Sequence, residues 1–553
     1  MGTDQQTHEI FNQAPDLAGT NLFSTDHTLQ RIVAHYDGAW GNDALTDYGR
    51  LAGGELAEQG HLANRHTPEL RTHDRYGRRI DVVEFHPAYH HLMRTAIAGG
   101  VHALPWSTPR PGAHVVRAAL ELLHNQADSG TDCPLTMTFA SIPALRGNPE
   151  LAALWEPGIL SHHYDGRNLP YTEKRGLTLG MGMTEKQGGT DVRANTSRAT
   201  LLNEHIAGGE CAELTGHKWF CSAPMSDGFL TLAKLNGQLS CFLMPRWRPD
   251  GSRNNLYLQR LKDKLGNRSN ASSELEFRDA FAWLIGEPGR GVAAIIPMVA
   301  LTRFNCMVGS TAIMRQAVQQ VINHIRHRSV SGKKLIDQPL MRNVAADLVL
   351  ETEAALWLTF RVARALDHRE SDPAEDLFVR LVTALGKYWI CKRAPQHINE
   401  AQECLGGLGY VEEYVLPRLY REAPVNSIWE GSGNVQCLDV LRALQRSPES
   451  VDVLLQEIEG STGAHRVFDQ AVQGLRAQIT AAAGDESMAR IVVERMAILL
   501  QAALLLRHTN EAVSAAFVTS RLQPTTLAYG GITDAAAIAV LLQTIEPADR
   551  TRL

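Results

Sequence analysis

The sequence has few of the features that mark secreted, zinc-binding or membrane-spanning proteins. Its eight cysteines are scattered over 553 residues without a CxxC pair, which predicts reduced thiols rather than a disulfide framework or a zinc site. Residues 1–16 lack the charged and apolar segments of a secretory signal. The longest apolar run near the end, 496–506, is shorter than the roughly 20 residues that a spanning helix needs. We therefore expect a cytoplasmic protein with no membrane contact.

An excess of positive charge is also missing. The formal net charge of −6 excludes a chain whose overall charge attracts it to nucleic acid or a membrane surface. It does not exclude a local basic patch. Hydrophobic residues make up 44% of the chain and charged residues 21%, as in ordinary soluble globular proteins. At roughly 100–200 residues per domain, a chain of this length is expected to form several folding units.

The first half of the chain divides into two units of different texture. Residues 1–178 alternate helical stretches, such as 115–124, with polar loops and predict a helical domain. Residues 179–290 hold short runs rich in Thr, Val, Leu and aromatics, broken by Gly, Asn and Asp. Among them, Asn236-Gly237 is typical of a two-residue hairpin, because both central residues must adopt positive φ. This second unit predicts an antiparallel β domain.

The second half is helical. Residues 291–447 contain long segments with apolar residues at helical spacing, which predict an antiparallel bundle; these segments are 295–327, 339–367 and 377–403. Residues 448–553 are rich in Ala and Leu, and 488–508 is their clearest amphipathic stretch. The predicted fold class is therefore α+β and multidomain, with an additional C-terminal helical domain.

A glycine-containing loop follows the first predicted strand. The segment Met181–Asp191 reads MGMTEKQGGTD and carries the hydroxyl groups of Thr184 and Thr190. Glycines in such a loop let backbone N–H groups approach a ligand closely. The spacing fits neither GxGxxG nor the P-loop, so a Rossmann phosphate site is not supported. A simple β-turn explains the same segment.

The next motif places an indole and a hydroxyl group close together on a strand. In the segment GHKWFCS, Trp219 could pack against a flat heterocycle and Ser222 could hydrogen-bond to its edge. A Trp in a strand is also a common core residue, and this alternative stays open.

The third motif is SIWEGSGNV, in which Glu430 lies among apolar and glycine neighbours just before a predicted helix. A poorly solvated carboxylate has a raised pKa, which suits it to proton abstraction. The alternative is a glutamate that caps the turn. Two glycine clusters accompany the motif, 328–332 before a helix and 403–410 after one, and the second is also typical of a helix C-cap.

In this order, the motifs resemble the acyl-CoA dehydrogenase family over about residues 80–445. The segments MGMTEKQGGTD, GHKWF, RLKDKLGNRSNAS and RLYREAPVNSIWEGSGN are similar to one branch of it, the alkylation-response flavoproteins of the AidB type. The C-terminal helical unit extends that likeness over nearly the whole chain. The resemblance implies an α–β–α fold with FAD bound outside any Rossmann domain.

The resemblance also implies roles for individual residues. Glu430 matches the catalytic base, and the cofactor would be bound by residues of both halves of the chain. Those residues are Met183, Thr184, Gly189, Thr190, Trp219, Ser222, Arg328, Gly406, Gly407, Ile428, Gly431, Ser432 and Asn434. Arg328 and the glycine loop would contact FAD of a neighbouring subunit, which implies a homo-oligomer, expected to be a tetramer. The sequence departs from the family pattern at Ser331, Glu403 and Trp429.

The implied chemistry is α,β-dehydrogenation of an acyl-CoA thioester, weak and on short branched chains, in a protein that protects DNA against alkylation. A base removes the α-proton while N–H donors stabilise the developing enolate. The competing interpretation is a metabolic acyl-CoA dehydrogenase whose last domain serves assembly only.

The AidB branch is associated with double-stranded DNA, so the resemblance implies a DNA contact in the C-terminal domain. The candidate contacts are Arg490, Arg495, Arg507 and Arg521. Residues 450–553 nevertheless carry eight Arg and no Lys against eleven Asp and Glu, a net charge of −3, whereas phosphate requires a cationic face. Solvated helix faces explain the same arginines.

No metal site is predicted. His86 and His90 are four residues apart on a predicted helix, but no third ligand follows them at a useful spacing.

Overall fold

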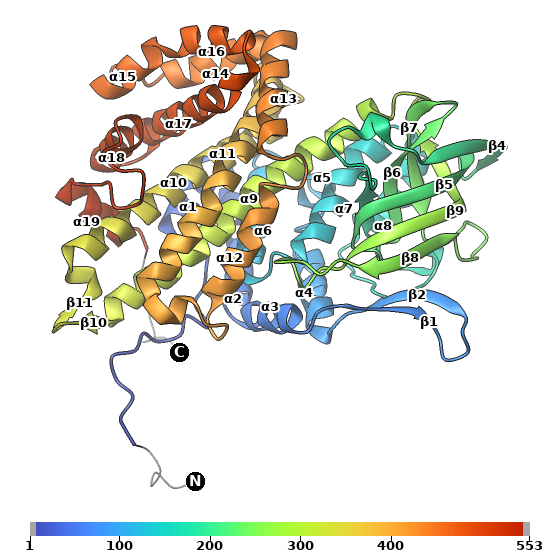
Figure 1. Cartoon of the computed structure of the whole chain (residues 1–553), viewed down its shortest axis with the longest axis horizontal. Helices are drawn as coiled ribbons and strands as arrows, with labels where there is room; N and C mark the ends of the chain where they lie inside the picture. Colours follow the sequence, from blue (N-terminus) through green and yellow to red (C-terminus); the bar gives the residue numbers. More distant parts are fainter. Residues whose placement is uncertain (1–6, 546–553) are drawn as a thin grey trace.

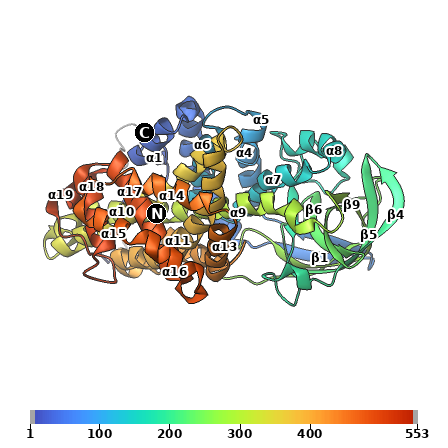
Figure 2. The same ribbon diagram turned by 90° about the horizontal axis from the view of Figure 1, so that it is seen from above.

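The computed structural model describes residues 7–545, with the side chain of Ala483 left out. The β domain lies at one end of the molecule and the C-terminal helices at the other, with the long helices between them (Figure 1). The view from above shows the same order (Figure 2).

The N-terminal unit is mainly helical and adds a β-hairpin that the sequence analysis did not predict. Its helices are α1 His27–His35, α2 Asn42–Gly53, α3 Glu55–Arg65, α4 Pro87–Ala98, α5 Leu104–Ser107, α6 Ala113–Ala127, α7 Asp132–Leu145 and α8 Pro149–Ile159. The hairpin joins β1 Glu69–His73 to β2 Arg79–Glu84 and packs against β8 of the next unit. Its outer face is exposed and polar, which explains why hydrophobic patterning did not reveal it.

The middle unit is a seven-stranded sheet. Its strands are β3 Leu179–Gly182, β4 Arg198–Ile206, β5 Gly209–Ser222, β6 Gly228–Leu235, β7 Gln238–Pro245, β8 Leu256–Leu261 and β9 Ser272–Ile285. Six strands follow the order β3-β6-β4-β5-β9-β7, β8 pairs with β9 beside this path, and a further β6–β7 pairing closes the path on itself. The predicted hairpin is confirmed: Asn236 and Gly237 both have positive φ, and Leu235 pairs with Gln238.

The expectation of a purely antiparallel sheet is wrong at one strand. β6 runs parallel to both β3 and β4. A parallel pair needs a long crossover connection, and the β4–β5 segment between β3 and β6 supplies one.

The helical bundle follows the predicted spacing closely. It consists of α9 Gly291–His327, α10 Pro339–His368, α11 Pro373–Leu405, α12 Val415–Asn426 and α13 Gly433–Arg446, with a small hairpin of β10 Ser329–Val330 and β11 Lys333–Lys334. By length and composition alone α9 could cross a membrane, but 56% of its most apolar window is buried in the protein. It packs against α6, α7, α10 and α11 and is a core helix.

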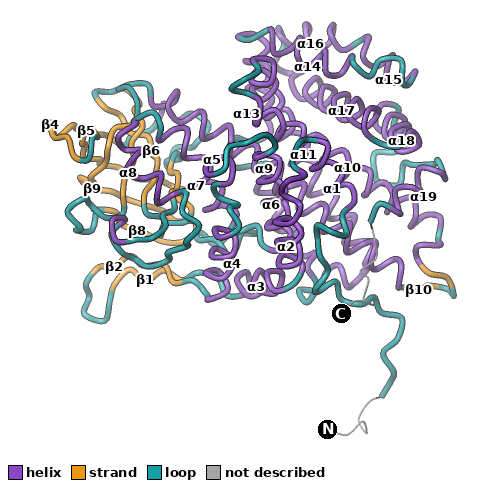
Figure 3. Tube along the Cα trace, turned by 180° about the vertical axis from the view of Figure 1, so that it is seen from behind, coloured by secondary structure: helices purple, strands orange, loops and turns teal. Residues whose placement is uncertain are grey.

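The C-terminal helices lie on the far side of the bundle from the sheet (Figure 3). They are α14 Glu449–Glu459, α15 Arg466–Gln473, α16 Leu475–Ala483, α17 Ala489–His508, α18 Glu511–Leu522 and α19 Ala535–Gln543. Leu454 and Leu500 belong to the same continuous hydrophobic core as Leu356 and Phe378 of the bundle. This unit is therefore joined to the bundle through a shared interior.

Candidate functional site

Glu430 lies in the loop between α12 and α13 with a backbone φ of +57°, followed by Gly431 at +99°. A positive φ is costly for a residue with a side chain and persists only where its surroundings hold it. Arg303 Nε and Gln436 Nε2 both donate to the Glu430 carbonyl oxygen at 3.0 Å. These two donors, from α9 and α13, hold the loop in the conformation that aims the carboxylate.

Among the described residues, the Glu430 carboxylate has one side-chain hydrogen-bond partner, the Thr302 hydroxyl group, which donates to Oε2 at 2.8 Å. Burial raises the pKa of Glu430, and the hydrogen bond from Thr302 and the charges of Lys387 and Arg303 offset only part of that rise. A carboxylate with a raised pKa and one weak partner is suited to taking up a proton.

Lys387 is a structural cation beneath this loop. It is buried in α11, and its ammonium group donates to the carbonyl oxygens of Asn426 at 3.0 Å and Gly431 at 2.9 Å. It thus joins the end of α12 to the loop of Glu430. The sequence analysis missed it; a lysine inside an otherwise apolar helical run was the available signal.

Cys133 connects the bundle side of the site to the sheet side. It lies in the first turn of α7, and its thiol is within hydrogen-bonding reach of Ser222 and within electrostatic range of Glu430. Burial raises the pKa of Cys133 to about 12, so it is a neutral thiol at physiological pH. The strand motif and the Glu430 loop therefore lie near the same residue.

Trp219 and Ser222 are half-buried near the end of β5. The Trp219 backbone N–H donates to the Thr184 carbonyl oxygen at 2.8 Å, which ties the indole to the glycine loop. The Lys262 ammonium group lies 3.2 Å from the Trp219 ring centroid and pairs with Glu274 at 2.6 Å. Trp219 is therefore not a buried core residue.

The glycine loop is organised by Glu185, which the sequence analysis missed. Its buried carboxylate accepts from Lys218 Nζ at 2.9 Å and from the Thr196 backbone N–H at 2.6 Å. Burial favours the neutral acid, but the charge of Lys218 and the hydrogen bonds outweigh it and hold the pKa of Glu185 well below its usual range. Gly188 has a φ of +125°, which only glycine adopts readily.

The predicted cofactor residues of this loop lie at the surface beside that carboxylate. Met183, Thr184 and Gly189 are half-exposed and Thr190 is exposed. The Met183 carbonyl oxygen accepts from Asn195 Nδ2 at 3.0 Å. Their backbone is therefore fixed while one side remains open to a ligand.

Three other predicted cofactor residues are far from Glu430 within one chain. Arg328 follows α9 and donates to the Asn12 carbonyl oxygen at 2.8 Å. At ~1.5 Å per residue, it lies about 39 Å along the helix from Thr302. Gly406 and Gly407 are exposed just after α11, and an added Cβ at either would meet no atom within 4 Å. A single subunit does not bring these residues to the site.

The remaining predicted residues flank Glu430. Ile428 is 64% exposed, and Ser432 is the N-cap of α13. The Asn434 side-chain oxygen accepts from Arg490 Nε of α17 at 2.8 Å. The C-terminal helices thus reach the edge of the candidate site.

The residues that depart from the family pattern have identifiable surroundings. Ser331 has a φ of +52° in the β10–β11 turn. Glu403 is exposed and accepts from Asn399 at 3.4 Å. The Trp429 indole N–H donates to Asn426 Oδ1 at 3.0 Å, which fixes the ring beside Glu430.

Three family descriptions match successive parts of the chain. Residues 12–166 match the adaptive response protein AidB N-terminal domain, 180–280 the acyl-CoA dehydrogenase middle domain and 289–445 the acyl-CoA dehydrogenase C-terminal domain. The "Putative acyl-CoA dehydrogenase AidB" of Escherichia coli (strain K12) is 47% identical over 93% of this chain and 94% of its own length.

This chain belongs to the acyl-CoA dehydrogenase family.

Two solved structures are similar over most of the chain. Caenorhabditis elegans ACDH-11, in complex with C11-CoA, has a TM-score of 0.83 at 25% identity and covers 99% of this chain and 94% of that one. The apo form of Bd2924 has a TM-score of 0.83 at 27% identity and covers 90% of this chain and all of that one.

Members of the acyl-CoA dehydrogenase family typically bind FAD. The half-exposed indole of Trp219 and the Ser222 hydroxyl group beside it suit the ring of such a cofactor. The open backbone around Gly188 and Gly189 suits its phosphates. The residues present therefore fit the group.

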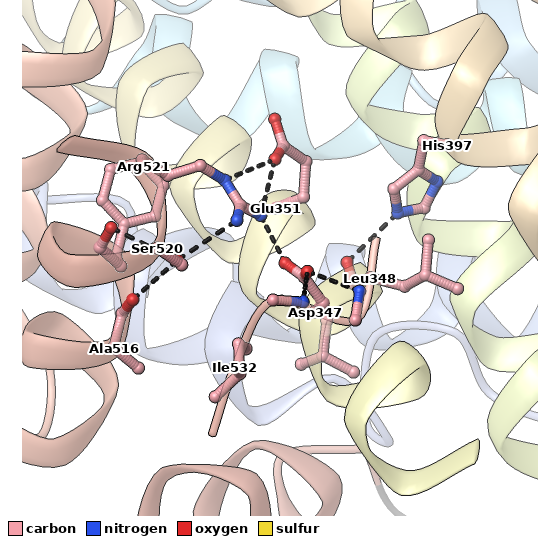
Figure 4. Close-up of polar contacts among 12 residues, drawn as sticks. Asp347, Leu348, Glu351, His397, Ala516, Ser520, Arg521 and Ile532 are labelled. Carbon is pink, nitrogen blue, oxygen red and sulfur yellow. Dashed lines mark hydrogen bonds and ion pairs between the residues drawn. The ribbon is translucent and has the colours of Figure 1, made fainter. Parts of the chain in front are cut away.

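The four arginines proposed as DNA contacts do not form one continuous positively charged surface, because two of them are paired with carboxylates. Arg521 lies between two carboxylates of α10, donating to Asp347 at 2.5 Å and to Glu351 at 2.9 Å, with 13% of its side chain exposed (Figure 4). The expectation for Arg521 is corrected, because a guanidinium group buried in two ion pairs is not available to phosphate. Arg507 pairs with Glu457 at 2.6 Å.

The other two arginines of that set differ from each other. Arg490 contacts Asn434, and burial lowers the pKa of Arg495. With Arg507 and Arg521 paired, Arg490 and Arg495 form a smaller candidate DNA-contact surface than the sequence indicated.

Neither histidine considered for a metal has a metal-like environment. His86 Nδ1 accepts from the Ala88 backbone N–H at the start of α4, and His90 Nδ1 contacts the Tyr164 hydroxyl group at 2.9 Å. Within residues 7–545, no group of three or more His, Cys, Asp or Glu side chains could hold a metal ion.

Proposed function

We propose that this protein is a FAD-containing, AidB-type member of the family that dehydrogenates an acyl-CoA thioester between its α- and β-carbons. Its activity is weak and directed at short branched acyl chains. A single observation carries the proposal. The Glu430 carboxylate, whose pKa is raised by burial, is within electrostatic range of the Cys133 thiol, and the same thiol is within hydrogen-bonding reach of Ser222. A base and a hydroxyl group therefore lie near the same buried thiol.

Glu430 takes the α-proton at its carboxylate. The Thr302 hydroxyl group orients that carboxylate, and the burial that raises its pKa makes protonation favourable. The backbone N–H of Glu430 donates to the thioester oxygen, where negative charge develops. FAD, when bound, supplies the acceptor for the hydride that leaves the β-carbon.

The residues that would hold FAD come from two subunits. Those beside the flavin ring and pyrophosphate are Met183, Thr184, Gly189, Thr190, Trp219, Ser222, Ile428, Gly431, Ser432 and Asn434. Arg328, Gly406 and Gly407 are too far from Glu430 in one chain and would serve a neighbouring subunit's FAD. This division supports a homo-oligomer, which we propose is a tetramer.

Reduction of the bound flavin tests this function. Purified protein should be yellow, and isobutyryl-CoA added without oxygen should bleach it, whereas Glu430→Gln should stay yellow with the same FAD content. Bleaching that is undiminished in Glu430→Gln would overturn the assignment of the base. Rapid, complete bleaching by straight-chain acyl-CoA would favour the metabolic alternative.

A second role is proposed beside the first: cytoplasmic protection of DNA against alkylation through binding of double-stranded DNA. It is supported by the match of residues 12–166 to the adaptive response protein AidB N-terminal domain. Arg490 and Arg495 on α17 are the remaining candidate contacts in the C-terminal unit.

A salt titration of duplex DNA binding tests this second role. The full chain should retard DNA at low salt, and Arg490→Ala with Arg495→Ala should weaken binding and reduce its salt dependence. Removing residues 448–553 is a poor test, because these helices share the core of the bundle. Absence of binding by the full chain at low salt would remove the DNA role.

A further inference from the structure

Lys264 is a half-buried cation that the proposed chemistry does not yet use. It lies in the loop between β8 and β9, and its three donors meet neutral oxygens. The ammonium group donates to the Asn270 carbonyl oxygen at 2.8 Å, to Ser272 Oγ at 3.0 Å and, weakly, to Asn267 Oδ1 at 3.5 Å. The ammonium group therefore donates its hydrogen bonds to neutral oxygens rather than to a carboxylate.

One of those hydrogen bonds leads toward Ser222, a candidate cofactor residue. Ser272 begins β9 and is the cross-strand partner of Ser222, the last residue of β5. Their hydroxyl oxygens are 3.0 Å apart. Ser222 in turn is near the Cys133 thiol and follows Trp219 on the same strand. Lys264, Ser272 and Ser222 therefore form a chain from a half-buried charge to the candidate cofactor site.

The charge of Lys264 determines the direction of this chain. By geometry alone, either serine could donate to the other. An ammonium group has donors and no acceptor, so Ser272 Oγ must accept from Lys264. The Ser272 proton is then available to Ser222 Oγ, which leaves the Ser222 proton to be donated to a bound ligand. A neutral Lys264 amine can accept a hydrogen bond, which would allow the hydroxyl groups of both serines to donate in the opposite direction.

We propose that Lys264 is a positioning residue that acts through Ser272 to make Ser222 a hydrogen-bond donor to the hydride-accepting edge of bound flavin. The proposal rests on the function proposed above. A donor fixed at that edge stabilises the electron-rich reduced ring more than the oxidised ring. Lys264 therefore raises the midpoint potential of the flavin.

The surroundings of Lys264 make this effect depend on pH. Burial lowers the pKa of Lys264 to about 8. The titratable groups that face it are the neutral thiol of Cys133 from α7 and Glu422 from α12. Burial raises the pKa of Glu422 to about 7, with Asp128 and Arg418 beside it. The relay should lose its cation as the pH rises from 7 to 9.5.

The test is the midpoint potential of bound FAD, measured against a reference dye at pH 7 and pH 9.5. At pH 7, Lys264→Gln and Ser272→Ala should each reduce the preference for reduced over oxidised flavin about tenfold, a potential lower by ~30 mV. Arg278→Gln is the matched control, because Arg278 is an exposed cation on β9 that pairs with Glu276. It should leave the potential unchanged. At pH 9.5, wild type and Lys264→Gln should converge.

The two variants separate the relay from simpler effects. Ser272→Ala keeps the cation and breaks the chain, so a normal potential in Ser272→Ala would overturn the relay even if Lys264→Gln shifted it. Equal potentials in all variants with full FAD content would overturn the role of Lys264. Wild-type protein that binds no FAD would instead remove the proposed function, and this inference with it.

Discussion

Glu430 and Glu351 are both carboxylates withdrawn from water, but the structure treats them in opposite ways. Glu351 of α10 accepts from Arg393 at 3.1 and 3.2 Å and from Arg521 at 2.9 Å. Burial raises its pKa, but the attraction of the two arginines outweighs burial and lowers the pKa to about 2. Within residues 7–545, the Glu430 carboxylate accepts a side-chain hydrogen bond only from the Thr302 hydroxyl group, and burial raises its pKa.

The difference separates a residue that holds the fold from one that is ready for chemistry. Glu351 joins α10 and α11 to α18 through a network that is permanently ionised at neutral pH, and so attaches the C-terminal helices. The Glu430 carboxylate has few hydrogen-bond partners, so its ionised form is poorly stabilised. Acids with perturbed pKa values of this kind cluster at functional sites.

The largest effect expected is the loss of the buried network. Glu351→Gln should destabilise the protein by about 3–5 kcal/mol, because it leaves Arg393 and Arg521 buried without their shared carboxylate. Denaturant unfolding of the holoprotein would measure this. The matched Glu430→Gln should change stability by less than ~1 kcal/mol or increase it. An equal loss of unfolding free energy in Glu351→Gln and Glu430→Gln would contradict the different roles assigned to the two carboxylates.

Acid should reveal the same contrast. The folded pKa of Glu351, about 2 against an ordinary 4.5, stabilises the fold by about 3 kcal/mol above pH 4.5, and this contribution is lost as the pH falls toward 2. Glu430 has the opposite sign, since its raised pKa favours the folded state at low pH and that contribution is lost as the pH rises. Between pH 4.5 and 2.5, wild type should therefore lose stability more steeply than Glu351→Gln.

The single partner of Glu430 can be removed without touching the base. Thr302→Val should raise the pKa of Glu430 further, because the hydrogen bond that favours the ionised form is gone. The rate of flavin bleaching at pH 6 should fall about fivefold, the equivalent of ~1 kcal/mol, and recover at pH 9. The control is Thr311→Val on the same helix, whose hydroxyl group contacts Thr359. A pH profile that does not move in Thr302→Val would contradict this account.

The smallest effect sharpens the comparison within the C-terminal helices. Arg507→Gln breaks a partly exposed pair with Glu457, 30% and 18% exposed, and should cost about 0.5 kcal/mol. Thermal unfolding should barely change. A loss as large as that of Glu351→Gln would mean that ion pairs at this surface contribute more than their exposure indicates.

Much of the fold was predictable because long helices repeat one pattern many times. The expected helices 295–327, 339–367 and 377–403 lie within α9, α10 and α11 and begin or end within a few residues of them. Short or edge elements gave weaker signals. The β1–β2 hairpin was missed, and so were the parallel pairings of β6, since a strand pattern does not state the direction of its neighbour.

The site was only partly predictable for a related reason. Glu430, Trp219 and Ser222 stand in short motifs whose residue types suggest their chemistry. Thr302 contacts Glu430 from 128 positions away, and the Ser272–Ser222 contact spans 50 positions. A local sequence pattern does not predict contacts between residues this far apart in the chain.

By itself the sequence determined the kinds and order of the elements, the family and the loop that carries the candidate base. Only the tertiary structure decided which charges are available. Arg521 looks like a phosphate ligand until α10 supplies Asp347 and Glu351, and Lys264 looks like a surface cation until β9 supplies Ser272. The physical reason is that pKa and availability depend on burial and on partners, and both are set by the packing of segments far apart along the chain.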